Sequence, residues 1–451
     1  MININSKITK NGIKIKFNKK NYELNYSKSI WSGLNNEMKG FLLDNISFLS
    51  TFHLPLFFDD DSIKYNTSEP LLKNFFKEIV LGDIPNFSDI EKKDTSEIIK
   101  KYYNMEFYFE NIEAKLPKWE ASGLDGASIN FTFGKESLLT FGVCREIGIE
   151  TELTYFHGSR EETEFKLKKI LATNFKKKFN QKINFVKNTL EYLNIAEKID
   201  AKSNTNWGYG NQLTEYTLAS LPLINHNLKK FILLGNEKSC NNYYFNQNGY
   251  KTYPVFDQSV KFMVDLNNII RLITNENVSV FSIVEPLNEI AIMKILHNRY
   301  PDVAKFQFSC FPDNINSSDR WCHYCTKCAR IYLFFKAIGI DPKLVGFKKD
   351  LFSKNFMNNF SIFNGKTENA VVYDYSGLGR DEQLFAFYLA YRNGQKGKAI
   401  ELFKKRYLNE AKQREDELIN EFFGIFEPKT IPKEYKSNIL SIYKEELENL
   451  F

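Results

Sequence analysis

The feature that most constrains the fold of this chain is a group of cysteines late in the sequence. Four of the six cysteines follow the spacing C-x11-C-x2-C-x2-C. Closely spaced C-x2-C turns present their thiolates to a single tetrahedral ion, so the pattern predicts a metal site closed by the protein. Zinc (Zn²⁺) is the expected occupant, and an iron–sulfur cluster is the alternative. Four protein ligands leave no position for water, which favours a structural role for Cys310, Cys322, Cys325 and Cys328.

The residues between these cysteines are expected to support the site. We expect Trp321 and Tyr324 to pack around it and His323 to be an exposed spacer rather than a fifth ligand. The two remaining cysteines are isolated. Cys144 falls within a helical pattern and is expected in the core, whereas Cys240 follows a polar turn.

Composition and charge limit the compartment and the partners. Six cysteines are few for 451 residues, and their clustering is typical of metal binding in a reducing compartment. The start of the chain lacks the apolar core of a signal peptide, and no apolar run approaches the roughly 18 residues of a membrane span. A net charge of +6 is small for this length and does not indicate nucleic acid. We therefore expect a cytoplasmic protein that handles an anionic small molecule, without a membrane or nucleic-acid partner.

The most informative segment for function is a junction at residues 128–147. Residues 128–133 (SINFTF) have the pattern of a strand, and residues 135–147 have apolar positions at helical spacing. The short loop around Gly134 would direct backbone N–H groups and the helix dipole toward an anion. Lys135 would add a cation and Ser137 a hydroxyl donor. The junction therefore predicts a phosphate-binding loop, and a simple capped turn is the alternative.

Further strand-like segments place this junction in an α/β domain. Residues 150–156 and 230–234 have strand character and are separated by helical segments, which predicts a parallel sheet with ligands at the carboxyl ends of its strands. We divide the chain into an α+β N-terminal region (1–125), a nucleotide-binding domain that includes the cysteines (126–345) and a mostly helical C-terminal extension (346–451).

The two flanking regions carry local patterns but no recognisable chemistry. Alternating residues around 18–20 predict an early hairpin, and helices are expected at 71–81 and 95–103. Amphipathic helices are expected at 397–423 and 433–451. We expect these last helices to pack against the core, with homodimerisation as the alternative role.

The sequence TFGKES at 132–137 resembles the S-G-G-x-D-S signature of the PP-loop ATP pyrophosphatase superfamily. Members of that superfamily cleave ATP between the α- and β-phosphates and transfer AMP to an oxygen of the substrate. Two positions depart from the signature, because Phe133 replaces a glycine and Glu136 replaces an aspartate. The extra methylene of Glu136 would move a carboxylate that helps to hold Mg²⁺, so reduced activity is an alternative. The resemblance implies nucleotide contacts at Thr132, Phe133, Gly134, Lys135, Glu136 and Ser137.

Two further resemblances point to branches of this superfamily. The sequence GNEKS at 235–239 is similar to a segment of 7-cyano-7-deazaguanine synthases, which adds Gly235 and Asn236 to the implied nucleotide contacts. In those proteins a Ser-Cys pair and a later C-x2-C-x2-C hold zinc, as 309–310 and 322–328 would here. The sequences EPLNE at 285–289 and WCHYCTKC at 321–328 resemble more closely the MurL-type UDP-N-acetylmuramoyl-L-alanyl-L-glutamate epimerases.

The epimerase resemblance implies a reaction and a substrate. ATP would activate the carboxylate of the terminal L-glutamate in the UDP-muramoyl dipeptide, and a proton would then leave Cα and return to the other face. We predict catalytic roles for Lys135 and Glu136, and for Glu237 and Glu289, which the resembling segments contain. Structural roles for these last two carboxylates are the alternative. The remaining candidates are Glu285, Asp374 and Asp381 as bases and Arg380 as a partner for a substrate anion.

Three other functions remain open from the sequence. A deazaguanine-type synthase would use the same adenylation, although the long flanking regions count against that smaller enzyme. A tRNA-modifying PP-loop enzyme would need a concentrated basic patch, and the run FKKKF at 175–179 is more typical of a solvated helix face. A non-catalytic nucleotide-binding protein would account for Phe133 and Glu136.

Overall fold

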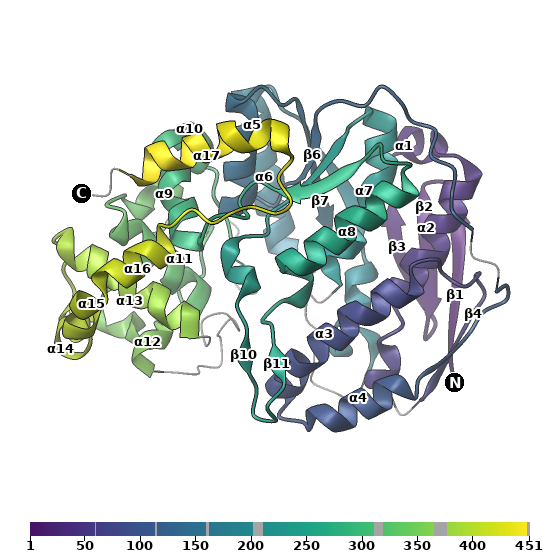
Figure 1. Cartoon of the computed structure of the whole chain (residues 1–451), viewed down its shortest axis with the longest axis horizontal. Helices are drawn as coiled ribbons and strands as arrows, with labels where there is room; N and C mark the ends of the chain where they lie inside the picture. The colour runs from purple at the N-terminus through teal and green to yellow at the C-terminus, as the bar shows by residue number, and fades with distance from the viewer. Residues whose placement is uncertain are drawn as a thin grey trace.

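A ten-stranded mixed sheet runs through the molecule in the order β12-β9-β6-β7-β8-β3-β2-β1-β4-β5 (Figure 1). The computed structural model describes residues 1–58, 60–112, 115–158, 162–201, 211–310, 319–364 and 377–448. Helices cover the sheet, and the last part of the chain forms a separate group of helices beside it (Figure 1). The architecture is therefore α/β with a helical C-terminal region.

Five neighbouring strands of the sheet run parallel to one another. Numbered in chain order, they lie in the spatial order 3-2-1-4-5, which is a doubly wound arrangement. The direction of winding reverses between β6 and β9, and ligands of doubly wound sheets bind at the carboxyl ends of the strands at such a reversal. The five strands are β6 (Ala127–Asn130), β7 (Thr151–His157), β8 (Ile183–Asn188), β9 (Phe231–Leu234) and β12 (Ser279–Ser282).

Two apolar cores lie on opposite faces of these strands. Phe231 and Leu233 of β9 belong to one core, and Ile232 and Leu234 belong to the other. Burial on both faces is typical of a central parallel strand and explains the continuous apolar run. The first core contains α5 (Lys135–Glu146), α6 (Glu162–Phe179) and α9 (Glu289–Arg299), and the second contains α7 (Gln212–Asn227) and α8 (Val260–Ile273).

The N-terminal region continues the same sheet. Its hairpin of β2 and β3 is confirmed, and Asn18 and Lys19 at the turn both have positive φ, 44° and 65°, as a type I′ turn requires. β3 then pairs antiparallel with β8, where Leu24 lies opposite Asn188. The strands of this region are β1 (Ile2–Thr9), β2 (Gly12–Phe17), β3 (Lys20–Asn25), β4 (Ser62–Tyr65) and β5 (Glu106–Tyr108).

Four helices of the N-terminal region cover its strands. The expected helix at 95–103 is confirmed as α4, and the helix expected at 71–81 is longer, because it continues through Pro85. The four helices are α1 (Lys28–Ser32), α2 (Asn36–Leu49), α3 (Lys73–Glu91) and α4 (Thr95–Tyr103). A separate two-stranded ribbon of β10 (Tyr244–Phe245) and β11 (Lys251–Thr252) follows β9 in the chain.

Short helical turns connect several of these elements. They are 3₁₀ helices with the bounds η1 (Leu54–Leu56), η2 (Leu190–Asn194), η3 (Ala196–Ile199), η4 (Lys238–Asn241), η5 (Phe256–Gln258), η6 (Pro342–Val345) and η7 (Lys354–Asn359). The turn η4 begins directly after Glu237, a predicted catalytic residue that follows the carboxyl end of β9.

The C-terminal region is helical, as expected. The amphipathic stretch at 397–423 divides into three helices, and the last helix, yellow in Figure 1, returns to pack on α9. Arg299 at the end of α9 donates to Glu445 at 2.8 Å and thereby holds this last helix. The helices are α10 (Pro301–Ala304), α11 (Thr326–Ala337), α12 (Ser361–Asn364), α13 (Gly377–Arg392), α14 (Lys398–Arg406), α15 (Leu408–Gln413), α16 (Glu415–Phe422) and α17 (Lys433–Leu447).

The helices also bear on whether the chain could cross a membrane. Within the part of the chain that the structure describes, none of them combines the length and the apolar character that a membrane span requires.

Candidate functional site

The loop at 132–137 joins the carboxyl end of β6 to α5. Gly134 is the residue that precedes the first turn of the helix, and its backbone N–H donates to Thr132 Oγ1 at 3.3 Å. Ser137 Oγ donates to the carbonyl of Gly134 at 3.1 Å and accepts from the backbone of Thr132 at 3.3 Å. Because these polar groups bond to one another, the loop is ordered by its own side chains.

Phe133 has an unusual conformation within this loop. Its φ of +63° lies in the left-handed region, which costs a residue with a side chain roughly 1–2 kcal/mol. The ring is fully buried and packs edge-on against Phe131, with ring centroids 4.9 Å apart, and against Phe175 at 6.0 Å. Burial of a Phe side chain contributes about 1.5–3 kcal/mol, which offsets the backbone strain. A large side chain can therefore occupy this position because the aromatic core holds it.

A lysine and three glutamates meet beside the loop. The Lys135 ammonium, which is 4 % exposed, pairs with Glu136, lies 3.4 Å from Glu289 Oε1 and lies 3.9 Å from Glu237 Oε2. Glu136 is in the first turn of α5, Glu237 follows β9, and Glu289 begins α9 after β12. The four residues thus come from the segments that follow β6, β9 and β12, and they converge where the winding of the sheet reverses. We call this group the carboxylate cluster.

An arginine that the sequence did not indicate contacts the carboxylate cluster. Arg330 of α11 is buried, and its Nε lies 3.2 Å from Glu289 Oε2. The sequence shows only that Arg330 lies two residues after Cys328 in the same helix, and this position does not predict which way its side chain points. The cysteine-bearing helix therefore contributes a charge to the carboxylate cluster.

Burial and neighbouring charges shift the acid–base properties of the cluster. Burial acts to lower the pKa of Lys135, but the three carboxylates raise it above its ordinary value. Burial acts to raise the pKa of Glu289, but nearby cations, first Arg330 and then Lys135, lower it to about 2. Burial and two carboxylate neighbours raise the pKa of Glu237 well above its ordinary value, against the opposing charge of Lys135. The surroundings therefore disfavour the anionic form of Glu237 and favour the anionic form of Glu289.

The same carboxylates have the arrangement of a cation site. Oxygen atoms of Glu136, Glu237 and Glu289 lie within 4.8 Å of one another. Oxygen ligands of this kind suit a hard divalent cation. Oε2 of Glu237 is buried, lies 3.9 Å from the Lys135 ammonium and accepts no hydrogen bond among the residues that the structure describes.

Gly235 and Asn236 support the cluster from the carboxyl end of β9. A Cβ atom on Gly235 would lie 3.0 Å from Cβ of Glu136, so a glycine allows these two segments of the chain to lie close together. Asn236 is buried; its side-chain amide donates to the carbonyl of Gln258 at 3.1 Å, and its carbonyl accepts from Ser282 at 2.6 Å. These contacts fix the segment that carries Glu237.

The other acidic candidates have different surroundings. Glu285 accepts hydrogen bonds from the backbone of Lys429 at 2.6 Å and of Thr430 at 3.0 Å, and so fastens the segment before α17. Asp381 pairs with Arg380 at 2.9 Å and with a second arginine, Arg414, in the C-terminal helices. These residues are outside the carboxylate cluster. Asp374 lies outside the residues that the structure describes.

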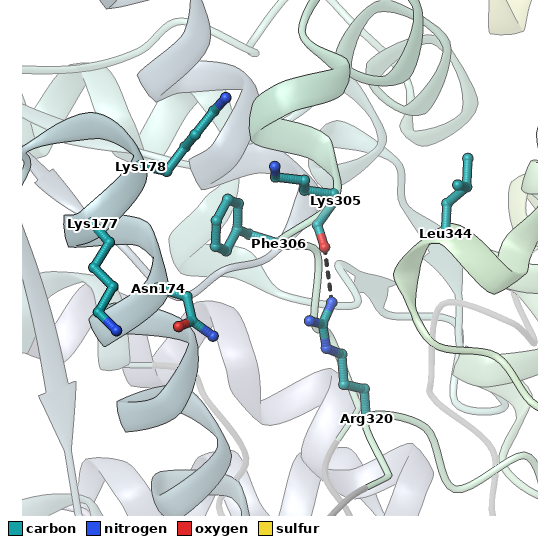
Figure 2. Close-up of a pocket in the computed structure, with 7 residues that line it drawn as sticks. All are labelled: Asn174, Lys177, Lys178, Lys305, Phe306, Arg320 and Leu344. Atoms are coloured by element: carbon teal, nitrogen blue, oxygen red, sulfur yellow. Dashed lines mark hydrogen bonds between the residues drawn. The ribbon is translucent and has the colours of Figure 1, made fainter.

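A basic concavity lies on another part of the surface (Figure 2). It is formed between the end of α6 and the segments that precede and follow the cysteines, and it has a volume of about 480 Å³. Its lining includes Lys177 and Lys178, which belong to the basic run interpreted from the sequence as a solvated helix face. None of its lining residues belongs to the carboxylate cluster.

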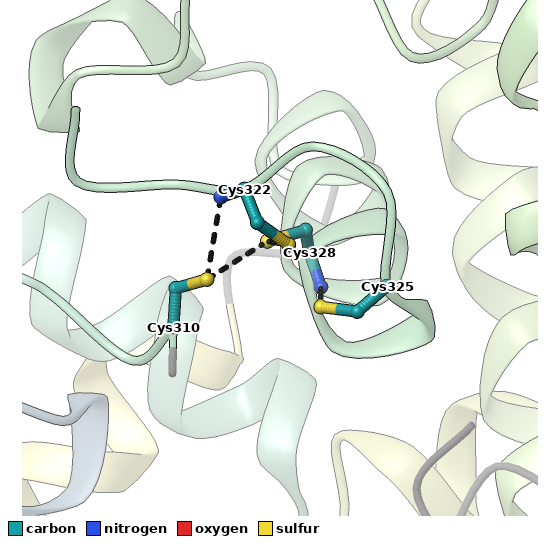
Figure 3. Close-up of side chains that lie close together, drawn as sticks. All are labelled: Cys310, Cys322, Cys325 and Cys328. Carbon is teal, nitrogen blue, oxygen red and sulfur yellow. Dashed lines mark hydrogen bonds between the residues drawn. The ribbon is translucent and has the colours of Figure 1, made fainter. Parts of the chain in front are cut away.

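The four late cysteines converge in space (Figure 3). Their sulfur atoms all lie within 4.8 Å of one another, with Cys328 at 3.5 Å from Cys322 and 3.6 Å from Cys310. Backbone amides of Cys322 and Cys328 donate to the sulfurs of Cys310 and Cys325, at 3.3 and 3.4 Å. Such N–H···S bonds favour the thiolate form. The group can therefore hold a metal ion such as zinc.

The expectation that His323 is exposed was wrong. Its side chain is 3 % exposed, its Nε2 accepts from the backbone of Lys348 at 3.1 Å, and its ring packs edge-on to Phe347. Its φ of +68° turns the chain between two cysteines and directs the ring inward. Trp321 is buried and stacks on Phe347 at 4.3 Å, whereas Tyr324 is 44 % exposed.

No protein-family model matches this chain, and no curated protein matches it either. A functional assignment therefore rests on the arrangement of the loop, the carboxylate cluster and the cysteines.

Proposed function

We propose that this chain is an ATP-dependent enzyme of the PP-loop type that adenylates a carboxylate and releases pyrophosphate. The observation that carries the proposal is the carboxylate cluster, in which the loop residues Lys135 and Glu136 meet Glu237 and Glu289 at the carboxyl ends of β6, β9 and β12. This is the place where a doubly wound sheet binds a nucleotide, and the 3-2-1-4-5 strand order supports it.

Each residue of the cluster has a role in this proposal. A substrate carboxylate oxygen would attack the α-phosphorus, the bond to the bridging oxygen would break, and its electron pair would leave with pyrophosphate. Lys135 would face the negative charge that develops on the departing phosphates, and the N–H groups at the start of α5 would orient them. Glu136 and Glu289 would hold Mg²⁺, which when bound neutralises phosphate charge.

The sharpest form of the proposal is an epimerase. The substrate would be UDP-N-acetylmuramoyl-L-alanyl-L-glutamate, whose terminal carboxylate is activated so that the proton on Cα becomes more acidic. Glu237 is the candidate to exchange that proton because its Oε2 accepts no hydrogen bond from the described residues. The epimerase assignment rests on the sequence resemblance at 285–289 and 321–328.

We also propose that the four cysteines hold zinc in a structural role. A tetrahedral ion with Zn–S bonds of about 2.3 Å separates its sulfurs by about 3.8 Å. The separations of 3.5 and 3.6 Å and the 4.8 Å limit for all pairs suit one ion. A four-iron cluster would need its thiolates farther apart, because the cluster core lies between them.

The function is tested by incubating the purified protein with ATP, Mg²⁺ and the muramoyl dipeptide in D₂O. Water must finally cleave the acyl phosphate, which returns the carboxylate and frees AMP. AMP and pyrophosphate in equal amounts, with deuterium at Cα of glutamate, are therefore the expected products. If AMP forms but glutamate carries no deuterium, the adenylation proposal stands and the epimerase assignment is wrong. Nucleotide binding without AMP, for any carboxylate offered, would contradict the enzyme proposal in favour of a binding protein.

Two substitutions test the catalytic roles that we propose for residues of the carboxylate cluster. Lys135→Met and Glu237→Gln are expected to lower kcat about 10²- to 10³-fold, the size typical for loss of one transition-state contact. The matched control is Glu276→Gln, which makes the same change at a side chain that is 78 % exposed and that precedes β12, whereas Glu289 follows the other end of that strand. Equal losses in all three variants would contradict the assigned roles.

A further inference from the structure

The basic concavity has walls from two distant parts of the sequence. One wall is the last turns of α6, and the other is formed by the segment after α10, the residue before Trp321 and a residue of η6 (Figure 2). It has a volume of about 480 Å³ and is open to solvent, and three of its cationic side chains, Lys177, Lys178 and Lys305, are exposed. The lining consists of Asn174, Lys177, Lys178, Lys305, Phe306, Arg320 and Leu344.

The charge in this lining is of one sign. Lys177, Lys178, Lys305 and Arg320 are cations, and the described lining contains no carboxylate. Among the residues that the structure describes, none of the four forms an ion pair, whereas Arg299, for example, pairs with Glu146 at 2.6 Å. Lys177 and Lys178 lie in the last turn of α6, where the helix dipole favours cations, and a bound anion would add a counter-charge shared with the other two cations of the lining.

The floor of the concavity is held by packing rather than by surface side chains alone. The Phe306 ring is buried against Phe175 and Phe179, with centroids 5.1 and 6.0 Å away. Arg320 Nη1 donates to the carbonyl of Lys305 at 2.8 Å, as the dashed line in Figure 2 shows. The guanidinium is therefore oriented before any ligand arrives, and its remaining N–H groups can serve an acceptor.

The concavity is distinct from the carboxylate cluster. A crossover helix runs antiparallel to the strands that it joins, so the end of α6 points away from the carboxyl ends of β7 and β8. Lys177 and Lys178 lie in that last turn. A ligand bound there would not occupy the place that we propose for ATP.

We propose that the basic concavity binds a phosphate-bearing small molecule at a second site, between the end of α6 and Arg320. A planar, fixed guanidinium recognises two phosphate oxygens at once, and flexible lysines add point charges around it. A nucleic acid would need a longer stripe of cations. The charge here is confined to one hollow in a chain whose net charge is +6, which favours a compact anion.

The test is calorimetric titration of inorganic pyrophosphate into the full chain, in buffer without Mg²⁺ or ATP. All proteins carry Lys135→Met, which removes the lysine that we propose faces the phosphates of ATP. In that background, saturable binding of one pyrophosphate is expected, and Arg320→Gln or the pair Lys177→Gln with Lys178→Gln should weaken it about tenfold or more. The binding is independent of the adenylation proposal, so either can fail alone.

The matched control is Lys176→Gln, which removes the same charge from the same turn of α6 but does not line the concavity. It should retain pyrophosphate affinity within about twofold, because Lys176 is not among the residues that line the concavity. Thermal melts confirm that each variant is folded. Equal weakening by the control, or no saturable binding in the Lys135→Met parent, would overturn the proposal. Displacement of pyrophosphate by transfer RNA at lower concentration would also overturn it in favour of a nucleic-acid surface.

Discussion

The backbone amide of Phe308 donates a 2.9 Å hydrogen bond to the carbonyl of Phe133. Phe308 lies two residues before Cys310, and Phe133 lies in the loop at 132–137. The segment that enters the cysteine site is therefore bonded directly to the candidate phosphate loop. Arg330, which follows the cysteines in α11, reaches the carboxylate cluster from the other side through Glu289. The two candidate sites are thus mechanically connected.

Loss of the metal should consequently affect the loop. Cys328→Ser is expected to remove the bound ion, lower the melting temperature by several degrees and weaken nucleotide binding, because structural zinc sites contribute directly to folding. Metal content by mass spectrometry, together with ATP titration, measures both effects. Cys144→Ala is the control, since Cys144 lies in the apolar core and outside the group of four. An unchanged ATP affinity in a metal-free, folded protein would show that the cysteine site does not influence nucleotide binding at the loop.

Substitutions at Phe133 should separate backbone strain from packing. Both Phe133→Gly and Phe133→Ala lose the buried ring, at a cost of about 3–5 kcal/mol. Glycine adopts the φ of +63° without the penalty that alanine retains, so the glycine variant should be more stable than the alanine variant by about 1 kcal/mol. Urea denaturation of the two variants measures this difference. An alanine variant of equal or greater stability would contradict the left-handed conformation.

The pair of Arg330 and Glu289 should show strong energetic coupling. Arg330→Met leaves a buried carboxylate with one cation fewer, and such losses typically cost about 3–5 kcal/mol. Glu289→Gln in addition removes the uncompensated charge, so the double variant should be more stable than the sum of the single effects predicts. A double-mutant cycle in urea provides the coupling free energy. Simple additivity would mean that the 3.2 Å contact contributes nothing.

Two glycines should respond oppositely to alanine. Gly235→Ala would place a Cβ atom 3.0 Å from Cβ of Glu136 and should displace that carboxylate, lowering ATP turnover more than stability. Gly40→Ala lies within α2, where nothing is within 4 Å of the added atom, and should stabilise the protein by about 0.5–1 kcal/mol. Steady-state kinetics and thermal melts compare the two. Full activity in Gly235→Ala would remove the steric argument.

Asp257 should make stability depend on pH between about 4 and 7. Burial raises the pKa of this carboxyl from 3.8 to about 7 in the folded protein. The folded state therefore keeps a proton that the unfolded state loses, so the contribution of Asp257 is complete below about pH 4 and is lost by about pH 7, at about 1.4 kcal/mol per pH unit. Burial, and then the charge of Asp257, also raise the pKa of Asp83.

The test of this dependence is Asp257→Asn, whose amide oxygen can still accept from the Leu213 backbone, as Asp257 does at 3.0 Å. Between pH 5 and pH 7.5, the unfolding free energy should fall less for the variant than for the wild type. Parallel pH profiles would show that Asp257 is ionised in the folded state.

Local patterns in the sequence located the elements that carry the site. The strand and helix on either side of Gly134 were predicted from spacing alone. β6 ends at Asn130, before the expected Phe133: the amide of Phe131 still donates to Thr154 of β7 at 2.7 Å, and the chain then turns at the left-handed Phe133. The convergence of the four cysteines likewise followed from their spacing. Local patterns succeed where neighbours in sequence decide the outcome.

The identity of the residues that meet was harder to predict. Glu237 and Glu285 both follow buried strands, yet one faces Lys135 and the other binds the backbone before α17. The direction of each side chain depends on strand register and on helices far away in the chain, which one sequence does not encode locally. The burial of His323 escaped prediction for a similar reason, because its left-handed turn is imposed by the cysteines around it.

The pairing of β3 with β8 has a consequence for any attempt to shorten this chain. Removal of the first 125 residues would turn β8 from an interior strand into an open edge, with unpaired amides and carbonyls along one side. An exposed edge of that kind recruits strands from other molecules and promotes aggregation. The N-terminal region therefore covers the edge of the parallel half of the sheet, and a core-only fragment should associate with itself more readily than the intact chain.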